Sequence, residues 1–213
     1  MKPLILASAS PRRAELLRAA GIEFDVVPAN ADETIHPGDT PEAYVRRVAE
    51  AKASAVMRRA NGRRVLAADT VVVVGDVILG KPLDRDDARR MLRMLSGRSH
   101  EVLTAVALSR GPRPPSPQVG FGGPRGSVPH VETSAPHVEI RVERTEVEFA
   151  PLTDDDISWY VATGEPDDKA GAYAIQGYAS RFITGITGSY SNVVGLPVAL
   201  VVEMMKRAPD LIR

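Results

Sequence analysis

Apolar residues are arranged in two ways along this chain of 213 residues. Short runs rich in β-branched residues predict strands, and stretches in which apolar residues recur every three or four positions predict helices. The strand pattern is found at residues 4–7, 24–28, 65–68, 71–74, 77–79, 100–108 and from 138 onward. The helical pattern is found after Ser10, Thr40, Asp84, Thr153 and Pro197. Strands and helices therefore alternate through much of the chain.

Capping residues indicate where the helices begin. Ser10 and Thr40 are each followed by a proline, which is favoured at the first position of a helix. Asp84 and Thr153 are each followed three residues later by an acid, in the manner of a capping box. We therefore predict these four residues as N-caps.

Asp69 interrupts the most apolar part of the chain, residues 64–82. A carboxylate buried there without a partner would be costly, so Asp69 is expected at a strand end, where a cation, a metal ion or water can meet it. Gly75 and Asp76 predict a hairpin turn, and the returning strand brings Lys81 near the same end of the sheet. This arrangement is typical of a catalytic acid or a metal ligand. An Asp that pairs with a Lys for solubility is the alternative.

Positive charge is concentrated where the first strand turns into the first helix. The free backbone N–H groups at a helix start form a site for an anion. Arg12 and Arg13 lie in the first turn and oppose the helix dipole unless an anion binds nearby. The placement favours a phosphate ligand, and a solvated basic turn is the alternative in this Arg-rich chain.

Three other stretches contain candidate functional residues, and each of them also has a simpler structural interpretation. Glu33 lies in a polar loop at 30–38, where acids can serve solubility alone. Lys52 lies close to the apolar stripe of its helix, where a Lys that extends to solvent is the simplest interpretation. The small residues of 167–177 indicate close approach of the backbone to a ligand, or glycine-rich turns.

Residues 111–137 differ in composition from the rest, because 12 of these 27 residues are Gly or Pro. Such a segment cannot bury enough apolar surface to offset the entropy of ordering it. We therefore interpret the chain as a single domain, residues 1–213, with a flexible Pro/Gly-rich loop inserted at 111–137.

Composition narrows the class of protein further. The 27 basic residues balance the 27 acidic ones, so a field that attracts nucleic acid is not expected. The chain has no Cys, which excludes disulfides and thiolate metal sites and suits a reducing compartment. No long apolar run is present, so we predict neither export nor a membrane span. A cytoplasmic protein is expected.

Six short motifs occur in order along the chain outside residues 111–137. They are SASPRR (8–13), AADTVV (67–72), KP (81–82), LSGRSHEV (95–102), DKAGAYAIQG (168–177) and GSYSNVVGLP (188–197). In this order and spacing they resemble the Maf family of nucleoside triphosphate pyrophosphatases, specifically its branch that acts on dTTP and UTP. The loop at 111–137 departs from the shorter connection of that family.

The resemblance implies a fold and an activity. The fold is α/β and elongated, like that of the inosine triphosphate pyrophosphatases, with a long mixed β-sheet flanked by helices in two lobes around a central cleft. The activity is hydrolysis of dTTP and UTP, and of modified pyrimidine nucleotides as further candidates, to the nucleoside monophosphate and pyrophosphate. The implied cofactor is a divalent cation, Mg²⁺ or Mn²⁺.

The resemblance also carries over individual residues. Asp69 matches the catalytic carboxylate, as a base or as a metal ligand, and Glu33 matches an acid associated with the metal. Arg12, Lys52 and Lys81 match the phosphate-facing cations, and Ser8 and Arg13 are also expected to bind the substrate. Thr70 and Gln176, the latter in a predicted YAIQG strand, match positions linked to base choice.

Two other function classes stay open beside the enzyme. A nucleotide-binding regulator of cell division or septum formation would use the same pocket with little turnover. A structural or interaction module would bind no triphosphate at all. The presence of Asp69, Lys52 and Lys81 together favours the enzyme, and the sequence is compatible with a homodimer.

Overall fold

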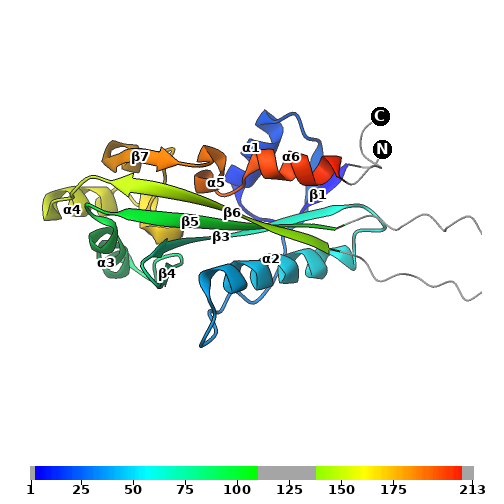
Figure 1. The fold of residues 1–213 in the computed structure, drawn as a ribbon, viewed down its shortest axis with the longest axis horizontal. Coiled ribbons are helices and arrows are strands. Elements are labelled where there is room, and N and C mark those ends of the chain that lie inside the picture. The colour runs from blue at the N-terminus through cyan, green and yellow to red at the C-terminus, as the bar shows by residue number, and fades with distance from the viewer. Residues whose placement is uncertain (1–2, 110–137, 208–213) are drawn as a thin grey trace, which may run out of the picture.

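The structure is a computed structural model that describes residues 3–109 and 138–207. The loop predicted at 111–137 lies outside the described residues. Within them, no helix is long and apolar enough to cross a membrane. The molecule is elongated along the direction of its longest strands (Figure 1).

A mixed sheet forms the central layer of the described chain (Figure 1). Its strands are β1 (Leu4–Leu6), β2 (Phe24–Val26), β3 (Val65–Val74), β4 (Val77–Leu79), β5 (Ser99–Ser109), β6 (Val138–Phe149) and β7 (Ile183–Thr187). The order across the sheet is β2-β1-β3-β5-β6-β7, and β4 pairs with β3. β1 is parallel to β2 and β3, and the other pairs are antiparallel. The prediction of an α/β fold with a long mixed sheet is confirmed.

The helices begin where the capping residues predict. The α-helices are α1 (Pro11–Ala19), α2 (Pro41–Met57), α3 (Arg85–Leu95), α4 (Asp154–Ala162), α5 (Tyr190–Val194) and α6 (Val198–Lys206), and the 3-10 helices are η1 (Glu165–Asp168), η2 (Ala170–Ala172) and η3 (Tyr178–Phe182). The side chains of Ser10, Thr40, Asp84 and Thr153 each accept a hydrogen bond from the third residue of the following helix. All four predicted N-caps are therefore confirmed.

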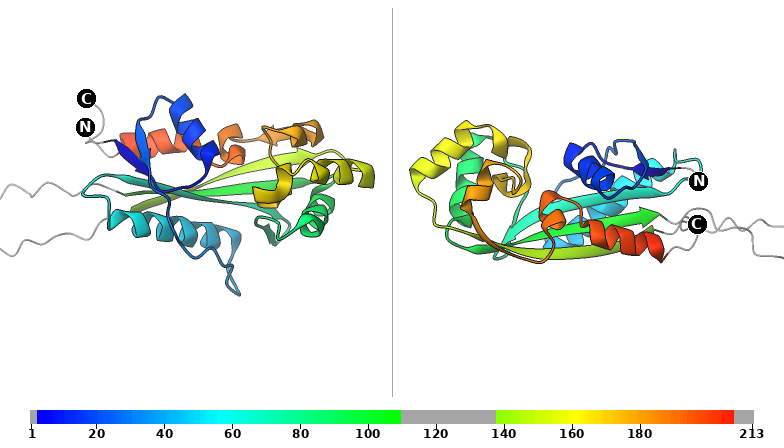
Figure 2. Two further views of the ribbon diagram at one scale, coloured as in Figure 1. Left: turned by 180° about the vertical axis from the view of Figure 1, so that it is seen from behind. Right: turned by 90° about the horizontal axis from the view of Figure 1, so that it is seen from above.

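Successive side chains of β3 pack against different layers of helices. Val71 and Val73 pack on α2, which covers one face of the sheet. On the other face, Leu66 and Ala68 pack with α1 and α6. Val72 on that face packs with α3 and α4. Figures 1 and 2 show α2 on one side of the sheet and α1 with α6 on the other. Two groups of helices thus share the second face, in agreement with the predicted two lobes.

One edge of β3 is left open in its middle. β1 pairs with β3 at Val65 and Leu66, and β4 pairs with it from Val72 to Val74. The opposite edge of β3 is occupied by β5. Between β1 and β4, residues 67–71 therefore face no strand of the described chain. We call this segment the β3 window, because side chains from both faces of the sheet can reach the same opening there.

Candidate active site

Asp69 lies in the β3 window, in the middle of a ten-residue strand. The predicted position at a strand end is wrong, since Asp69 is in register with Ala105 of β5 and is only 5% exposed. A carboxylate is tolerated there because α2 supplies a cation. The Lys52 Nζ donates a hydrogen bond of 2.7 Å to Oδ1 of Asp69. The partner that the charge requires thus comes from a neighbouring layer instead of from solvent.

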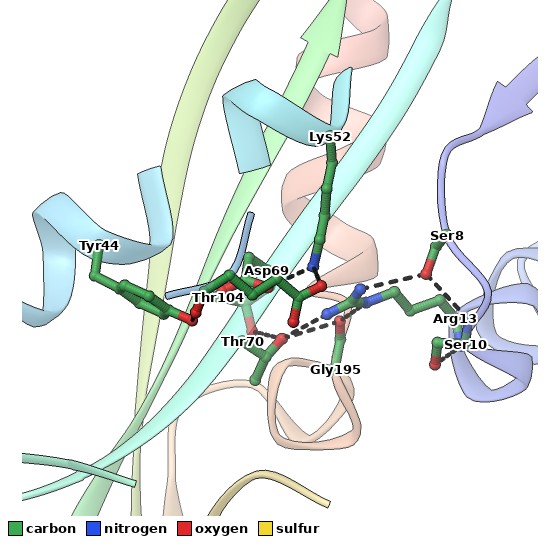
Figure 3. A network of polar contacts seen from close by, with 10 residues as sticks. Ser8, Ser10, Arg13, Tyr44, Lys52, Asp69, Thr70, Thr104 and Gly195 are labelled. Carbon is green, nitrogen blue, oxygen red and sulfur yellow. Dashed lines mark hydrogen bonds and ion pairs between the residues drawn. The ribbon is translucent and has the colours of Figure 1, made fainter. Parts of the chain in front are cut away.

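Lys52 also contacts the carboxylate of Glu33. The distance from Lys52 Nζ to Glu33 Oε1 is 2.8 Å, and the Glu33 side chain is half exposed whereas that of Lys52 is 9% exposed. The interpretation of Lys52 as a side chain extended to solvent is therefore wrong. Figure 3 shows it reaching from α2 to Asp69. We call Glu33, Lys52 and Asp69 the Lys52 cluster.

The pKa values of the two carboxyl groups are shifted in opposite directions. Burial raises the pKa of Asp69, although the charge and hydrogen bond of Lys52 oppose the shift. Burial acts in the same sense on Glu33, but the hydrogen bond and charge of Lys52, together with the charge of Lys81, lower its pKa below the usual value. Two carboxyl groups with pKa values pushed apart are suited to different roles, one as a constant anion and one as a proton acceptor.

Arg13 forms a second polar network on the opposite face of β3 (Figure 3). Its Nε donates to the carbonyl oxygen of Gly195 at 2.8 Å, and its Nη2 donates to Thr70 Oγ1 at 3.1 Å. Its Nη1 lies 3.3 Å from Ser8 Oγ. Thr70 Oγ1 is also 2.9 Å from Oγ1 of Thr104. We call these five residues the Arg13 network, and its polar side chains have partners within the protein.

The remaining predicted cations lie nearer the surface. Arg12 Nη1 is 3.6 Å from Oδ2 of Asp168, which also forms an ion pair with Lys169. Lys81 follows β4 and is exposed, and its charge contributes to the lowered pKa of Glu33. Lys81 lines the same cavity as Asp69, but Asp69 lies within β3 and not at the predicted sheet end.

A cavity of about 560 Å³ brings the predicted site residues together. Its lining includes Ser8, Arg12, Arg13, Glu33, Lys52, Asp69, Thr70, Lys81 and Gln176. Apolar side chains also line it, among them Val72, Val102 and Ile175. This volume is in the range of about 300–1,000 Å³ that is typical of small-molecule sites. The roles of these residues toward a substrate stay predictions.

Gln176 is exposed in a turn between η2 and η3, so the predicted YAIQG strand is wrong. The small residues around it are required by packing within the protein. A Cβ on Gly171, which has a φ of +69°, would lie 2.7 Å from a methyl carbon of Val72. A Cβ on Gly177 would lie 1.9 Å from an oxygen of Glu165. The stretch contains glycine-rich turns and also lines the cavity, so close approach of its backbone to a ligand stays a prediction.

Several polar residues of the cavity were not among the predicted ones. Tyr44 lines it and donates from its hydroxyl to the carbonyl oxygen of Glu33 at 2.8 Å. In the sequence Tyr44 falls at the start of an apolar helical stripe, which is typical of a core residue. Asp168 and Lys169 also line the cavity, and their position in the DKAGAYAIQG motif was the available signal.

His100 has a structural position. It is buried, and its Nε2 lies 2.9 Å from the hydroxyl of Tyr173. Its ring meets those of Tyr173 and Phe149 edge to face. Burial lowers the pKa of His100 to about 4, so the ring is neutral at physiological pH.

Two solved structures are similar to this chain in outline. The Ham1 protein of Staphylococcus aureus is 14% identical, with a TM-score of 0.48 over 97% of this chain and 99% of that one. The HAM1 protein of Coxiella burnetii is 16% identical, with a TM-score of 0.48 over 98% and 100% of the two chains.

Sequence relatives are much closer. A protein of Anaeromyxobacter sp. (strain Fw109-5) named dTTP/UTP pyrophosphatase is 54% identical over 96% of this chain and 89% of its own length. A protein of the same name from Koribacter versatilis (strain Ellin345) is 47% identical over 96% and 94% of the two chains. The family model described as Maf-like protein matches residues 3–208. The chain therefore belongs to the Maf-like protein family.

Proposed function

We propose that the chain is a nucleoside triphosphate pyrophosphatase that hydrolyses dTTP and UTP to the nucleoside monophosphate and pyrophosphate. The observation that carries this proposal is the convergence of Glu33 and Asp69 on Lys52 inside a cavity lined by further cations. The relatives named dTTP/UTP pyrophosphatase, which are about half identical to this chain, support the choice of substrates.

The donor set of the Lys52 cluster fits a divalent cation that arrives with a triphosphate. Among the described residues, no group of three or more His, Cys, Asp or Glu side chains could hold a metal ion. Mg²⁺ is usually bound by one or two carboxylates together with substrate phosphates and water. Glu33 would hold Mg²⁺ or Mn²⁺ in this way, beside Asp69, which shares the ammonium of Lys52 with it. The cation would supply positive charge that neutralises the phosphate oxygens.

Asp69 is the proposed general base. Its carboxylate is buried, its pKa is raised by that burial, and only its Oδ1 accepts the bond from Lys52. A raised pKa brings a carboxylate closer to the range in which it accepts a proton effectively near neutral pH. Asp69 takes a proton from a water molecule whose oxygen attacks the α-phosphorus. The bond from that phosphorus to the bridging oxygen breaks, and pyrophosphate leaves.

The cations of the cavity stabilise the charge of the triphosphate. Lys52, Arg12 and Lys81 approach the cavity from three different parts of the chain, namely α2, the first turn of α1 and the loop after β4. Positive groups fixed before the substrate arrives favour the transition state of phosphoryl transfer without further reorganisation. A substrate phosphate would displace the Asp168 carboxylate from Arg12, because the two anions compete for the same guanidinium.

A panel of nucleoside triphosphates tests the function. The purified protein is incubated with dTTP, UTP, CTP and GTP, with and without Mg²⁺ or Mn²⁺, and pyrophosphate and nucleoside monophosphate are measured. We expect similar kcat/KM for dTTP and UTP, since one methyl group contributes only about 1 kcal/mol. CTP should be poorer by about 10-fold or more, because its base reverses the donor and the acceptor of the uracil edge.

Equal kcat/KM for UTP, CTP and GTP would contradict the proposal. Binding of UTP without any release of pyrophosphate would favour the nucleotide-binding regulator instead. A cytoplasmic location and a homodimer stay predictions from the sequence.

A further inference from the structure

Glu33 reaches the Lys52 cluster from a loop, unlike the other two members. Lys52 is fixed by the backbone of α2 and Asp69 by the ladder between β3 and β5. The loop that joins β2 to α2 has no regular structure around Glu33. A loop residue can be held in a binding geometry only by contacts with neighbouring elements.

Tyr44 of α2 provides one such contact. Its hydroxyl donates to the carbonyl oxygen of Glu33 at 2.8 Å, and the residue is only 6% exposed. Burial, with the negative charges of Asp69 and Glu33 next in size, raises the pKa of Tyr44 to about 12. The hydroxyl therefore keeps its proton and remains a donor at any physiological pH.

Arg47, one turn further along α2, holds the next part of the loop. Its Nη2 donates to the carbonyl oxygen of Thr34 at 2.8 Å and to the carboxylate of Asp39 at 2.6 Å. The same carboxylate oxygen accepts from the backbone N–H of His36 at 3.0 Å. The guanidinium also lies over the ring of Tyr44, 5.4 Å from its centroid. The loop is thus tied to α2 at several points along its length.

Side chains of α2 therefore bind both polar groups of Glu33, its backbone carbonyl and its carboxylate. Its carbonyl group is held by Tyr44 and its carboxylate by Lys52. Tyr44 and Lys52 are two helical turns apart, which separates them by about 12 Å along the axis of α2. Both residues line the cavity. The positions of Tyr44 and Lys52 on α2 therefore determine where the Glu33 carboxylate lies, although Glu33 itself belongs to the loop.

We infer that Tyr44 is a positioning residue, which with Arg47 holds the loop so that the Glu33 carboxylate faces Asp69 across the Lys52 ammonium. The expected effect on turnover rests on the proposed function. The effect on the loop and on cation binding does not depend on the substrate.

Tyr44→Phe is the test, because it removes one hydroxyl and keeps the ring that Arg47 covers. Tyr190→Phe is the matched control, since Tyr190 is half exposed and does not line the cavity. Three quantities are measured on each: hydrogen exchange of the backbone at residues 29–39, the dissociation constant of Mn²⁺ without nucleotide, and kcat and KM for UTP. The melting temperature shows that each variant is folded.

We expect faster exchange at residues 29–39 in Tyr44→Phe and no change elsewhere. Its Mn²⁺ dissociation constant should rise and its kcat/KM for UTP should fall, each by about 3- to 10-fold, the usual effect of one hydrogen bond. Tyr190→Phe should match the wild-type protein in all three. Exchange or Mn²⁺ affinity equal to wild type in Tyr44→Phe overturns the inference.

A double-mutant cycle with Glu33→Gln shows whether Tyr44 acts through Glu33. In the Glu33→Gln background, Tyr44→Phe should change Mn²⁺ affinity by less than about 2-fold. If the two substitutions weaken Mn²⁺ binding by fully additive amounts, Tyr44 acts independently of Glu33, and the inference is overturned. If the wild-type protein binds Mn²⁺ but hydrolyses neither dTTP nor UTP, the proposed function fails while the inference stands. If it binds no Mn²⁺ without nucleotide, hydrogen exchange at residues 29–39 decides: faster exchange in Tyr44→Phe supports the inference, and unchanged exchange overturns it.

Discussion

The Lys52 cluster and the Arg13 network lie back to back on β3, yet their polar groups are satisfied differently. Asp69 and Thr70 are consecutive in the strand and therefore belong to opposite faces. Thr70 is bonded to Arg13 and Thr104, so its hydroxyl is occupied within the protein. Asp69 shares the ammonium of Lys52 with Glu33, and the charges of Arg13 and Lys81 act on these carboxylates without an ion pair to either. The Lys52 cluster has capacity for another cation, and the Arg13 network has little left for a ligand.

From this difference we predict that the Lys52 cluster acts on the ligand and that the Arg13 network supports the fold, with members of both lining one cavity. A buried ion pair adds little to stability, because the cost of desolvating both charges offsets their attraction. The Lys52 cluster is therefore better explained by chemistry than by folding. The guanidinium of Arg13 connects α1 to the residue after α5 and to β3, so we expect it to support the fold. Burial lowers the pKa of Arg13, yet the group stays charged at neutral pH.

Asp69→Asn should have the largest effect on catalysis. The amide keeps the shape of the carboxylate but cannot accept a proton as a base does, so kcat should fall by about 10²–10⁴-fold. The fold should persist, because Lys52 retains Glu33 as a partner. Steady-state kinetics with UTP and a thermal melt measure both effects. Asp76→Asn, in the exposed turn of the same hairpin, is the control. A variant that keeps more than about a tenth of wild-type kcat would show that Asp69 is not the base.

Lys52→Met should destabilise the protein and change its response to pH. Removing one partner of a buried ion pair costs about 3–5 kcal/mol, because the other charge is left buried. Lys52 is the main group that opposes the raised pKa of Asp69, so the pKa of Asp69 should rise further. A folded-state pKa above the unfolded value means that stability falls as pH rises through the folded pKa. The free energy of unfolding, measured in urea from pH 4 to 8, should therefore be reduced most at the upper end.

The same variant links the pH profile of the reaction to Asp69. In the wild-type protein, kcat/KM should decline on the acidic side as Asp69 takes up a proton, at a pH above the ordinary range of an Asp. In Lys52→Met this decline should move to higher pH. Lys206→Met, at the exposed end of α6, should leave both profiles unchanged. If the acidic decline of kcat/KM occurs at the same pH in Lys52→Met as in the wild-type protein, a group other than Asp69 controls it.

Arg13→Lys distinguishes support from phosphate binding. The ammonium cannot reproduce the three directions in which the guanidinium donates, so buried acceptors lose partners at a cost of about 1–3 kcal/mol. The free energy of unfolding should fall by that amount, and kcat/KM by less than about 10-fold when it is measured well below the melting temperature. Arg58→Lys, exposed after α2, is the control. Unchanged stability with a loss of activity above about 100-fold would restore Arg13 to the phosphate-binding set.

Sequence patterns predicted the four capped helices and most of the strands, but they predicted neither β7 nor α5, nor the contacts between elements. Helix starts are local, since a cap such as Thr153 bonds a residue only three positions away. The pairing of Lys52 with Asp69 joins a helix to a strand, and it depends on the layer that α2 covers. Tyr44 was missed for the same reason, because a helical stripe shows that a residue is buried but not what its hydroxyl meets. The sequence alone indicates a strand end for Asp69, because it does not show that Lys52 is a buried partner.

Base choice should show the smallest effect, and it can be assigned to one of two residues. The hydroxyl of Thr70 is occupied by the Arg13 network, whereas Gln176 is exposed in the cavity wall and its amide has no hydrogen-bond partner among the described residues. An amide oriented by its neighbours can match the O4 and N3–H of uracil but not the reversed edge of cytosine. Gln176→Ala should therefore narrow the ratio of kcat/KM for UTP over CTP by about 3- to 10-fold, mainly by slowing UTP. Thr70→Val should lower stability and leave that ratio within about 2-fold of wild type. The opposite result, a ratio that changes with Thr70 and not with Gln176, would place the reading of the base on the strand and show that the Arg13 network takes part in recognition.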